Sequence, residues 1–255
     1  MTATPPVAAA SRGGLRQLAG SIVFTSFLFV CTALYAVLLL LVGPFLPFQR
    51  RFAMARQWAH VLLAVLKATC GLGYSVEGRE NLPPGCHVAL VKHSSAWETF
   101  GQLVLVPPHV WVLKRELSWV PILGWALALM RSIPIDRGSG HLAVNKVVER
   151  GKARLAEGEW LVIFPEGTRM PPGQTRRYGI SGALLATQAG CKVIPVAHNA
   201  GYFWPRRGLY KKPGTIRVVI GPPIEAAGRD PRVVNAEAQA WIEAHAGPPP
   251  GWVAD

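Results

Sequence analysis

The sequence predicts an α/β domain preceded by an N-terminal helical segment that anchors it in a membrane. From about Gly73 onward, short apolar stretches of strand length alternate with longer helical segments, which is typical of an α/β domain. Before that point, residues 17–49 carry no charged side chain, and this run exceeds the ~20 residues that a helix needs to cross a bilayer. We expect four regions: a disordered or interfacial N-terminus (1–16), membrane-anchoring helices (17–72), an α/β domain (73–246) and a flexible tail (247–255).

The uncharged run is predicted to be a retained membrane helix. A cleaved signal peptide would be shorter and would end in small residues, whereas this run ends in Gly43 and Pro44. Basic residues lie on both sides, with a slight excess after the run, which favours a cytoplasmic position for the rest of the chain. The same flanks also allow a re-entrant hairpin that enters one leaflet. A second apolar segment, residues 56–73, is short and interrupted by Lys67, and we expect it to lie in the membrane interface.

The α/β region is expected to contain six strands and five helices. The strands are predicted at residues 87–91, 110–113, 133–135, 161–164, 193–197 and 216–220. The helices are predicted at residues 97–105, 124–130, 141–157, 182–189 and 235–246. Polar stretches follow the strands, at the edge where open α/β folds collect their active sites.

The composition points to an anionic partner. Lys and Arg outnumber Asp and Glu by 27 to 14, which gives a net charge of +13. This balance favours nucleic acid or an anionic membrane surface, and the 50% hydrophobic content favours the membrane. The four cysteines are far apart with no CxxC pair, which argues against a zinc site or a disulfide framework and indicates a reducing compartment. We expect all four to be buried thiols: Cys31, Cys70, Cys86 and Cys191.

The candidate general base is His93, which directly follows the apolar stretch at residues 88–91, with a carboxylate at Glu98. A histidine at the end of a buried strand, near an acid that orients it, suits general-base chemistry. Five residues along a regular helix amount to about 500°, so the two side chains would not share a helical face. They can meet only if His93 lies in the turn before a helix and Glu98 folds back from its first turn. Ser94 and Ser95 suit that turn as N-cap residues. On spacing alone, a polar loop with an incidental histidine is the simpler interpretation.

Four motifs together favour a catalytic role for His93 over an incidental one. They are KHSSAWE at residues 92–98, IPIDRGSG at 133–140, FPEGTR at 164–169 and VIPVAHNAG at 193–201. In this order they resemble the glycerolipid acyltransferase family, and within it the bacterial 1-acyl-sn-glycerol-3-phosphate acyltransferases. The resemblance covers about residues 73–224, and FPEGTR is its most specific part.

The resemblance implies a fold and an activity. The fold is a mixed sheet with helices on both faces. The activity is transfer of a fatty acyl group from an acyl thioester to the sn-2 hydroxyl of lysophosphatidate, which gives phosphatidate. Acyl-CoA or acyl-carrier protein would be the co-substrate, with no other cofactor and no metal. The expected location is the inner, cytoplasmic membrane, with the catalytic domain on the cytoplasmic side and anionic lipids as neighbours.

The resemblance also implies roles for individual residues. His93 would be the general base, and Glu98 would orient the imidazole and stabilise its protonated form. The family usually has an aspartate at the position of Glu98, so the geometry of this pair departs from the usual pattern by one methylene. The acceptor-binding residues are expected to be Lys114, Arg137, Glu166, Gly167, Thr168 and Arg169. The two arginines suit bidentate contacts to phosphate, and the lysine adds a point charge.

Other residues with polar or aromatic side chains are expected to be structural. His141 and His198 are placed outside the site, Asp136 is a candidate salt-bridge partner, and Pro195 would shape the pocket wall. The basic cluster after residue 205 is expected to form a solvated face that could attract anionic headgroups: Arg206, Arg207, Lys211 and Lys212. The aromatic residues beside it would suit an interfacial belt: Tyr202, Phe203, Trp204 and Tyr210.

Three alternatives stay open at this point. Within the family, the acceptor could be lyso-ornithine lipid, glycerol 3-phosphate or another lysophospholipid. A membrane-anchored nucleic-acid-binding protein would explain the charge, but no known binding motif is present, and we expect no nucleic acid partner. A hydrolase that uses His93 to activate water would lack a GxSxG nucleophile and a metal-ligand cluster.

Overall fold

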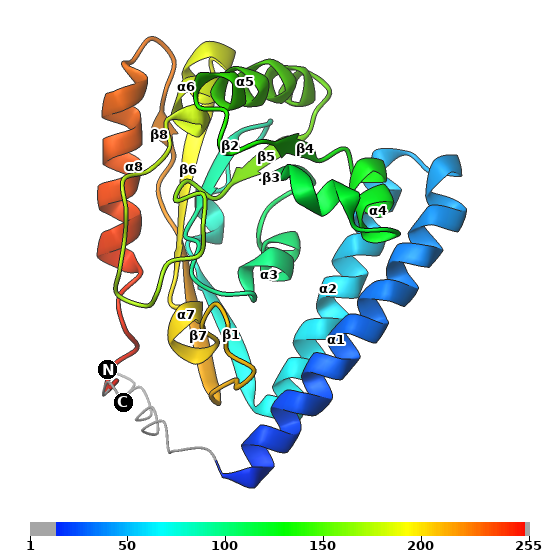
Figure 1. Ribbon diagram of the computed structural model, residues 1–255. Coiled ribbons are helices and arrows are strands. Elements are labelled where there is room, and N and C mark those ends of the chain that lie inside the picture. The colour runs from blue at the N-terminus through cyan, green and yellow to red at the C-terminus, as the bar shows by residue number, and fades with distance from the viewer. Residues whose placement is uncertain (1–13, 253–255) are drawn as a thin grey trace.

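The computed structural model describes residues 14–252 and begins with a helical hairpin (Figure 1). Helix α1 (Leu15–Val42) runs through the uncharged segment, and the short turn η1 (Gly43–Phe45) follows it. Helix α2 (Phe48–Cys70) ends at Gly71, whose φ of 64° is a left-handed conformation that glycine adopts without strain. The second helix starts at residue 48 rather than 56 and so includes the arginines that follow the uncharged run, one of which, Arg51, donates a hydrogen bond to the Leu129 carbonyl. The predictions for residues 1–13 and 253–255 fall outside the described residues.

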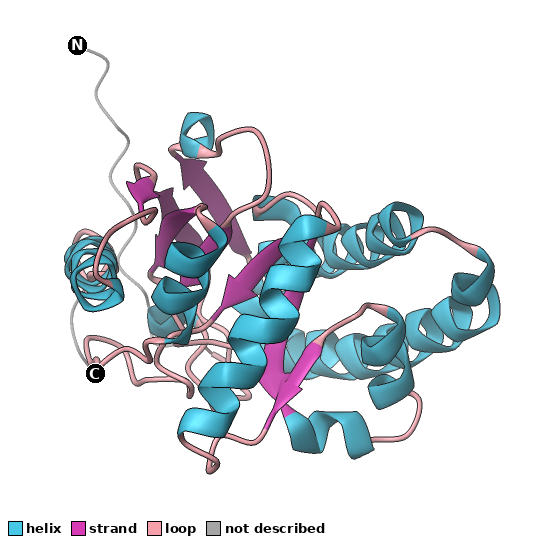
Figure 2. Cartoon of the chain, turned by 90° about the horizontal axis from the view of Figure 1, so that it is seen from above, coloured by secondary structure: helices cyan, strands magenta, loops and turns pink. Residues whose placement is uncertain are grey.

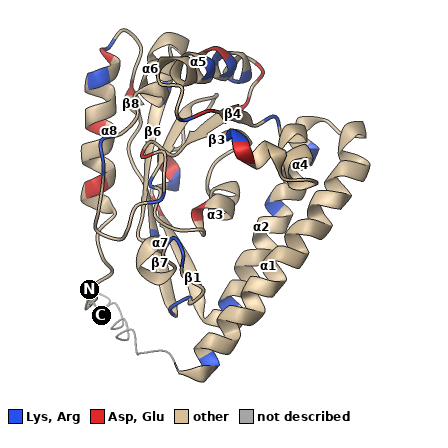
Figure 3. Ribbon diagram, in the orientation of Figure 1, with Lys and Arg blue, Asp and Glu red and all other residues tan. Residues whose placement is uncertain are grey.

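The first helix has one face packed on the protein and one apolar face exposed. Its buried residues include Phe24, Cys31 and Leu39, whereas Phe29 is 70% and Leu41 68% exposed. Figure 3 shows that α1 is free of charge beyond its first turn. The segment Leu15–Phe45 is long and apolar enough to cross a membrane. An apolar helix that is mostly exposed needs an apolar surrounding, and this helix is therefore a candidate membrane anchor.

The α/β part contains one mixed sheet, with strand order β1-β7-β6-β2-β5-β3-β4 and β8 paired to β6. The strands are β1 (Leu72–Glu77), β2 (Val88–Val91), β3 (His109–Lys114), β4 (Ile133–Ile135), β5 (Trp160–Ile163), β6 (Lys192–His198), β7 (Gly214–Ile220) and β8 (Ile224–Glu225). Strands β7 and β8 run antiparallel to β6, and the other pairs are parallel. Strands β2 and β5 are buried along their whole length, as central parallel strands covered on both faces should be.

Helices cover both faces of this sheet. They are α3 (Glu98–Leu105), α4 (Leu123–Leu129), α5 (His141–Ala156), α6 (Ser181–Ala189), α7 (Ala200–Phe203) and α8 (Pro231–His245), with the short turns η2 (Arg79–Asn81) and η3 (Arg115–Trp119). In Figure 1, α5, α6 and α8 lie along one face, and α3 lies on the other, between the sheet and the hairpin. Figure 2 shows the same layers from above, with the hairpin set to one side. The prediction of a mixed sheet with helices on both faces is confirmed.

The six expected strands and five expected helices are all present, and the structure adds two strands that the sequence pattern does not predict. Strand β1 lies at the glycine-containing boundary before the α/β region, and β8 has only two residues. Helix α8 starts at Pro231 rather than at residue 235, because Asp230 caps it by accepting the Arg232 N–H at 2.8 Å.

The predicted solvated basic face is wrong for Lys211, which is 1% exposed. Its ammonium donates to the carbonyls of Ser21 and Leu209 at 3.3 and 2.7 Å, and lies 4.7 Å from the centre of the Trp204 ring. Burial lowers the pKa of Lys211 to about 8. The interfacial belt is wrong for the buried side chains of Phe203 and Trp204. Lys211 and Trp204 are covered because α1 packs against them, a contact between distant parts of the chain.

A further expectation needs correction. Of the four cysteines, Cys31 and Cys70 are buried, whereas Cys86 and Cys191 are only half-buried, and all are free thiols. In the region predicted to be a flexible tail, Trp252 lies edge-on to Tyr202, with ring centres 5.3 Å apart.

Candidate active site

The turn between β2 and α3 brings His93 and Glu98 together. Strand β2 ends at Val91, helix α3 begins at Glu98, and the His93 Nδ1 atom lies 2.9 Å from Glu98 Oε1. The carboxylate also accepts the N–H of Ser94 at 2.9 Å and that of Ser95 at 2.8 Å. The sequence-based prediction that Glu98 folds back onto the turn is thus confirmed. The carboxylate thus satisfies the N–H groups of Ser94 and Ser95, and the Ser95 hydroxyl accepts that of Trp97 at 3.1 Å.

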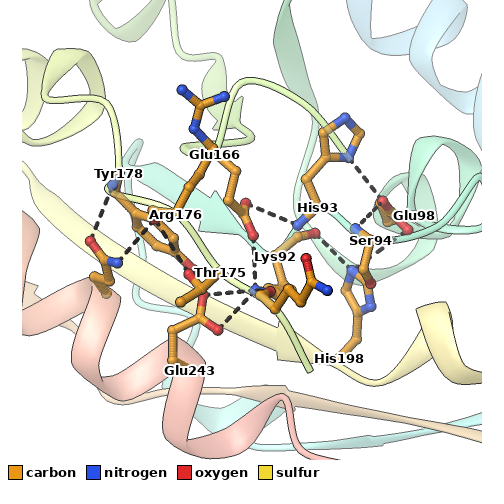
Figure 4. A network of polar contacts seen from close by, with 12 residues as sticks. Lys92, His93, Ser94, Glu98, Glu166, Thr175, Arg176, Tyr178, His198 and Glu243 are labelled. Atoms are coloured by element: carbon orange, nitrogen blue, oxygen red, sulfur yellow. Dashed lines mark hydrogen bonds and ion pairs between the residues drawn. The ribbon is translucent and has the colours of Figure 1, made fainter. Parts of the chain in front are cut away.

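The contacts of His93 fix its orientation. Since Glu98 is an acceptor, the bond assigns the proton to Nδ1 and leaves the lone pair on Nε2. Phe164 stacks on the ring with centres 4.3 Å apart and planes 20° apart. In Figure 4 the imidazole points away from the rest of the polar network, with one nitrogen bonded to Glu98. The geometry provides a histidine whose second nitrogen can accept a proton.

Glu98 is held ionised despite its burial. It is 1% exposed, and this desolvation alone would raise its pKa, but the hydrogen bond from His93, the neighbouring His198 and the Ser95 N–H together lower the pKa below its ordinary value. An ionised carboxylate beside an imidazole stabilises the protonated ring. This is the electrostatic requirement for a histidine that takes up a proton during a reaction.

His198, at the end of β6, supports this turn from behind. It is 1% exposed, its Nε2 lies 2.8 Å from the Lys92 carbonyl and 3.7 Å from Glu98 Oε2, and Trp97 packs edge-on against it. Burial lowers the pKa of His198. The expectation that His198 is structural agrees with these contacts.

The FPEGTR loop after β5 is bonded to the same turn. Glu166 Oε2 accepts the His93 N–H at 3.1 Å, and the Met170 N–H donates to the His93 carbonyl at 2.8 Å. Glu166 Oε1 lies 3.0 Å from the ammonium of Lys92. Burial raises the pKa of Glu166 to about 7. The sequence predicts that Glu166 binds substrate, but it is 3% exposed and both of its oxygens face the protein. In this structure its contacts are with the His93 backbone N–H and the Lys92 ammonium, so it connects the FPEGTR loop to the His93 turn.

The cationic residues lie at the same edge of the sheet, where the parallel strands β2, β5, β3 and β4 end. Arg137, after β4, donates to the Gly167 carbonyl, which places its guanidinium beside the FPEGTR loop. Gly167 has a φ of 67°, the left-handed conformation that this tight turn requires. Thr168 and Arg169 follow it and are half-buried. The Arg169 Nε is buried with no hydrogen-bond partner among the described residues.

Among the predicted binding residues, Lys114 has no direct contact with the His93 turn or the FPEGTR loop among the described contacts. It ends β3, its side chain is 51% exposed, and its ammonium lies 2.9 Å from Glu116 on the following turn. Asp136 forms the local salt bridge that the sequence suggested, with Arg115 at 2.9 Å. His93, Glu98, Arg137 and the FPEGTR loop are therefore joined by direct contacts, whereas Lys114 pairs with its own neighbour.

Sequence reasoning missed two residues that hold the site. Lys92 stands directly before His93, and its position between an apolar strand and a histidine is a local signal of burial. Glu243, on α8, is the other, and it lies 2.8 Å from the Lys92 ammonium. Nothing in the local sequence of α8 distinguishes this glutamate from Glu237, the other acidic residue of the helix.

A histidine–carboxylate pair at the edge of a mixed sheet suits general-base chemistry such as acyl transfer, and α1 is a candidate membrane anchor. A family model described as "Acyltransferase" matches residues 73–199. The chain is 41% identical over 230 residues to the 1-acyl-sn-glycerol-3-phosphate acyltransferase of Pseudomonas aeruginosa, in a match that covers 89% of this chain and 90% of that protein. The chain belongs to the 1-acyl-sn-glycerol-3-phosphate acyltransferase family.

More distant relatives agree with this assignment. The mouse 1-acyl-sn-glycerol-3-phosphate acyltransferase alpha is 28% identical over 184 residues, which cover 71% of this chain and 65% of the mouse protein. The crystal structure of the LPA acyltransferase PlsC from Thermotoga maritima has the same fold, with a TM-score of 0.75 at 21% identity, covering 90% of this chain and 94% of that one.

Proposed function

We propose that the enzyme transfers a fatty acyl group from an acyl thioester to the sn-2 hydroxyl of 1-acyl-sn-glycerol 3-phosphate, which yields phosphatidate. The observation that carries this proposal is the buried His93–Glu98 pair, joined at 2.9 Å and set beside the FPEGTR loop and Arg137. The 41% identity to a curated enzyme of that name supports the choice of acceptor.

The proposed reaction needs one base and no covalent enzyme intermediate. His93 Nε2 takes the proton from the sn-2 hydroxyl as its oxygen attacks the thioester carbonyl, and Glu98 stabilises the imidazolium that forms. The tetrahedral intermediate then breaks the carbon–sulfur bond. The departing thiolate takes the proton from Nε2, so a new ester and a free thiol are formed and His93 returns to its neutral state.

The oxyanion of that intermediate needs hydrogen-bond donors, and several backbone N–H groups near His93 and Gly167 are already engaged. The N–H groups of Ser94 and Ser95 donate to Glu98, that of His93 donates to Glu166, and that of Gly167 donates to the Phe164 carbonyl at 3.0 Å. These backbone groups hold the turn together. They do not serve the oxyanion in this conformation.

Replacing Arg169 or Arg137 with alanine should raise the KM for lysophosphatidate about 10-fold or more and change kcat much less. The reason is that a charge-assisted contact to the acceptor phosphate contributes roughly 1.5–3 kcal/mol. Steady-state kinetics with varied acceptor at saturating donor tests this. Arg150→Ala, an exposed arginine on α5, is the matched control. A fall in kcat at unchanged acceptor KM would contradict a role in phosphate binding.

The acceptor and donor are tested by a substrate panel. We expect phosphatidate from lysophosphatidate, with slower turnover of glycerol 3-phosphate and lyso-ornithine lipid, which are the competing acceptors within the family. Acyl-CoA and acyl-carrier protein are the candidate donors, and we propose that no further cofactor and no nucleic acid take part. We place the catalytic domain at the cytoplasmic face of the inner membrane, where the basic residues that follow α1 would meet anionic lipids.

A further inference from the structure

Lys92 lies at the junction of three separate parts of the chain. It is 4% exposed, and its ammonium is 3.0 Å from Glu166 Oε1 in the FPEGTR loop and 2.8 Å from both carboxylate oxygens of Glu243 on α8. It also donates to the Gln174 carbonyl at 3.2 Å. Figure 4 shows the lysine between the two glutamates, on the side of the turn away from the His93 ring. A buried lysine needs such partners, because an unpaired buried charge is costly.

Helix α8 binds the chain that follows the FPEGTR loop through one stripe of side chains. Asn235, Gln239 and Glu243 are spaced four residues apart and therefore lie on one face of the helix. Asn235 donates to the Tyr178 carbonyl at 3.2 Å, and Gln239 accepts the Tyr178 N–H at 3.1 Å. Glu243 accepts the hydroxyls of Tyr178 at 2.6 Å and Thr175 at 2.8 Å. The stripe fixes residues 174–178 to the helix.

These contacts continue to the reacting histidine. Glu243 holds Lys92, Lys92 holds Glu166, and Glu166 accepts the His93 N–H at 3.1 Å. The path starts at Glu243 on α8 and ends at the backbone of His93, the proposed base. Helix α8 lies outside residues 73–199, the region that the family model matches. None of the three charged groups touches the His93 ring. They can therefore act on the reaction by holding the turn and the loop in place.

We propose that Lys92 and Glu243 are positioning residues, by which α8 sets the FPEGTR loop and the His93 turn at the distance that acyl transfer requires. The inference rests on the proposed function, since it assumes that His93 is the base and that the loop binds the acceptor. A displacement of about 1 Å at a reacting group can cost about 10²-fold in rate. Loss of the pair should therefore lower kcat rather than only the stability of the fold.

The decisive variant is Glu243→Gln, which keeps the size of the side chain and an oxygen for Tyr178 and Thr175 but removes the charge that pairs with Lys92. We expect kcat per folded enzyme to fall about 10- to 100-fold, with a rise in acceptor KM and an unchanged donor KM. Glu237→Gln is the matched control, because Glu237 lies on the same helix in an exposed pair with Arg229 at 2.7 Å. That control should keep the wild-type kcat.

A double-mutant cycle with Lys92→Met separates positioning from general destabilisation. Once Lys92 is absent, Glu243→Gln should cause little further loss of kcat, although each single variant causes a large one. Thermal unfolding of each variant gives the folded fraction at the assay temperature. A wild-type kcat for folded Glu243→Gln, or losses that multiply independently in the double variant, would overturn the positioning role. Failure of the wild-type enzyme to acylate lysophosphatidate would instead overturn the proposed function.

Discussion

Replacement of His93 with alanine is expected to lower kcat about 10³-fold, within the 10²–10⁴ range that a positioned general base contributes. The loss follows because Nε2 of His93 is the group that would take the hydroxyl proton, and the Glu98 bond at 2.9 Å orients the ring for that role. The variant should still associate with membranes, since α1 is untouched. Initial rates of phosphatidate formation, with membrane fractionation of both proteins, measure the two effects separately.

The control for this variant is His141→Ala, which removes an exposed histidine at the start of α5. It should leave kcat and membrane association at wild-type values. Activity of the His93→Ala enzyme within 10-fold of wild type would show that another group takes the proton. Loss of membrane binding together with activity would point to misfolding, which thermal unfolding in detergent would reveal.

Replacement of Glu98 with alanine is expected to reduce both activity and stability. The carboxylate accepts the N–H groups of Ser94 and Ser95 as well as His93 Nδ1. Without it, two buried backbone donors lose their acceptor, at a cost of about 1–3 kcal/mol each. The ring also loses the partner that fixes its tautomer, so we expect kcat to fall roughly 10²-fold or more. Kinetics and thermal unfolding of the purified enzyme measure the two losses.

Glu98→Asp is the informative comparison, because it keeps the charge and shortens the side chain by one methylene. It should retain more activity and a higher Tm than Glu98→Ala. Equal activity in the two variants would mean that the carboxylate does not act through His93. If the Glu98→Asp enzyme were as unstable as the alanine variant, the length of the side chain rather than its charge would determine the stability of the turn between β2 and α3.

Much of the fold could be predicted because its signals are local. The uncharged run predicts α1, and the buried strands β2 and β5 read as continuous apolar stretches because both of their faces are covered. Strand β1 could not be found this way. It pairs with β7, which starts at Gly214 far along the chain, and its own burial varies from residue to residue because it lies at the edge of the sheet. A strand defined by a distant partner leaves a weak local pattern.

The site residues also differ in whether the local sequence predicts their contacts. The meeting of His93 and Glu98 could be predicted because only a turn followed by a helix brings the two together. The burial of Glu166 and Lys211 could not, because each is covered by a part of the chain distant in sequence. Glu243 carries no local signal, since its partner Lys92 lies near the opposite end of the domain sequence. The roles of Glu166, Lys211 and Glu243 thus became clear only from the tertiary contacts.

The most direct test of the central claim is the product formed from 1-acyl-sn-glycerol 3-phosphate and an acyl thioester by purified enzyme, identified by mass spectrometry with positional analysis of the acyl chains. We predict phosphatidate with the new chain at sn-2 for the wild-type enzyme, and about 10³-fold less for His93→Ala. No phosphatidate from the folded wild-type enzyme with either acyl-CoA or acyl-carrier protein as donor would contradict the proposed function.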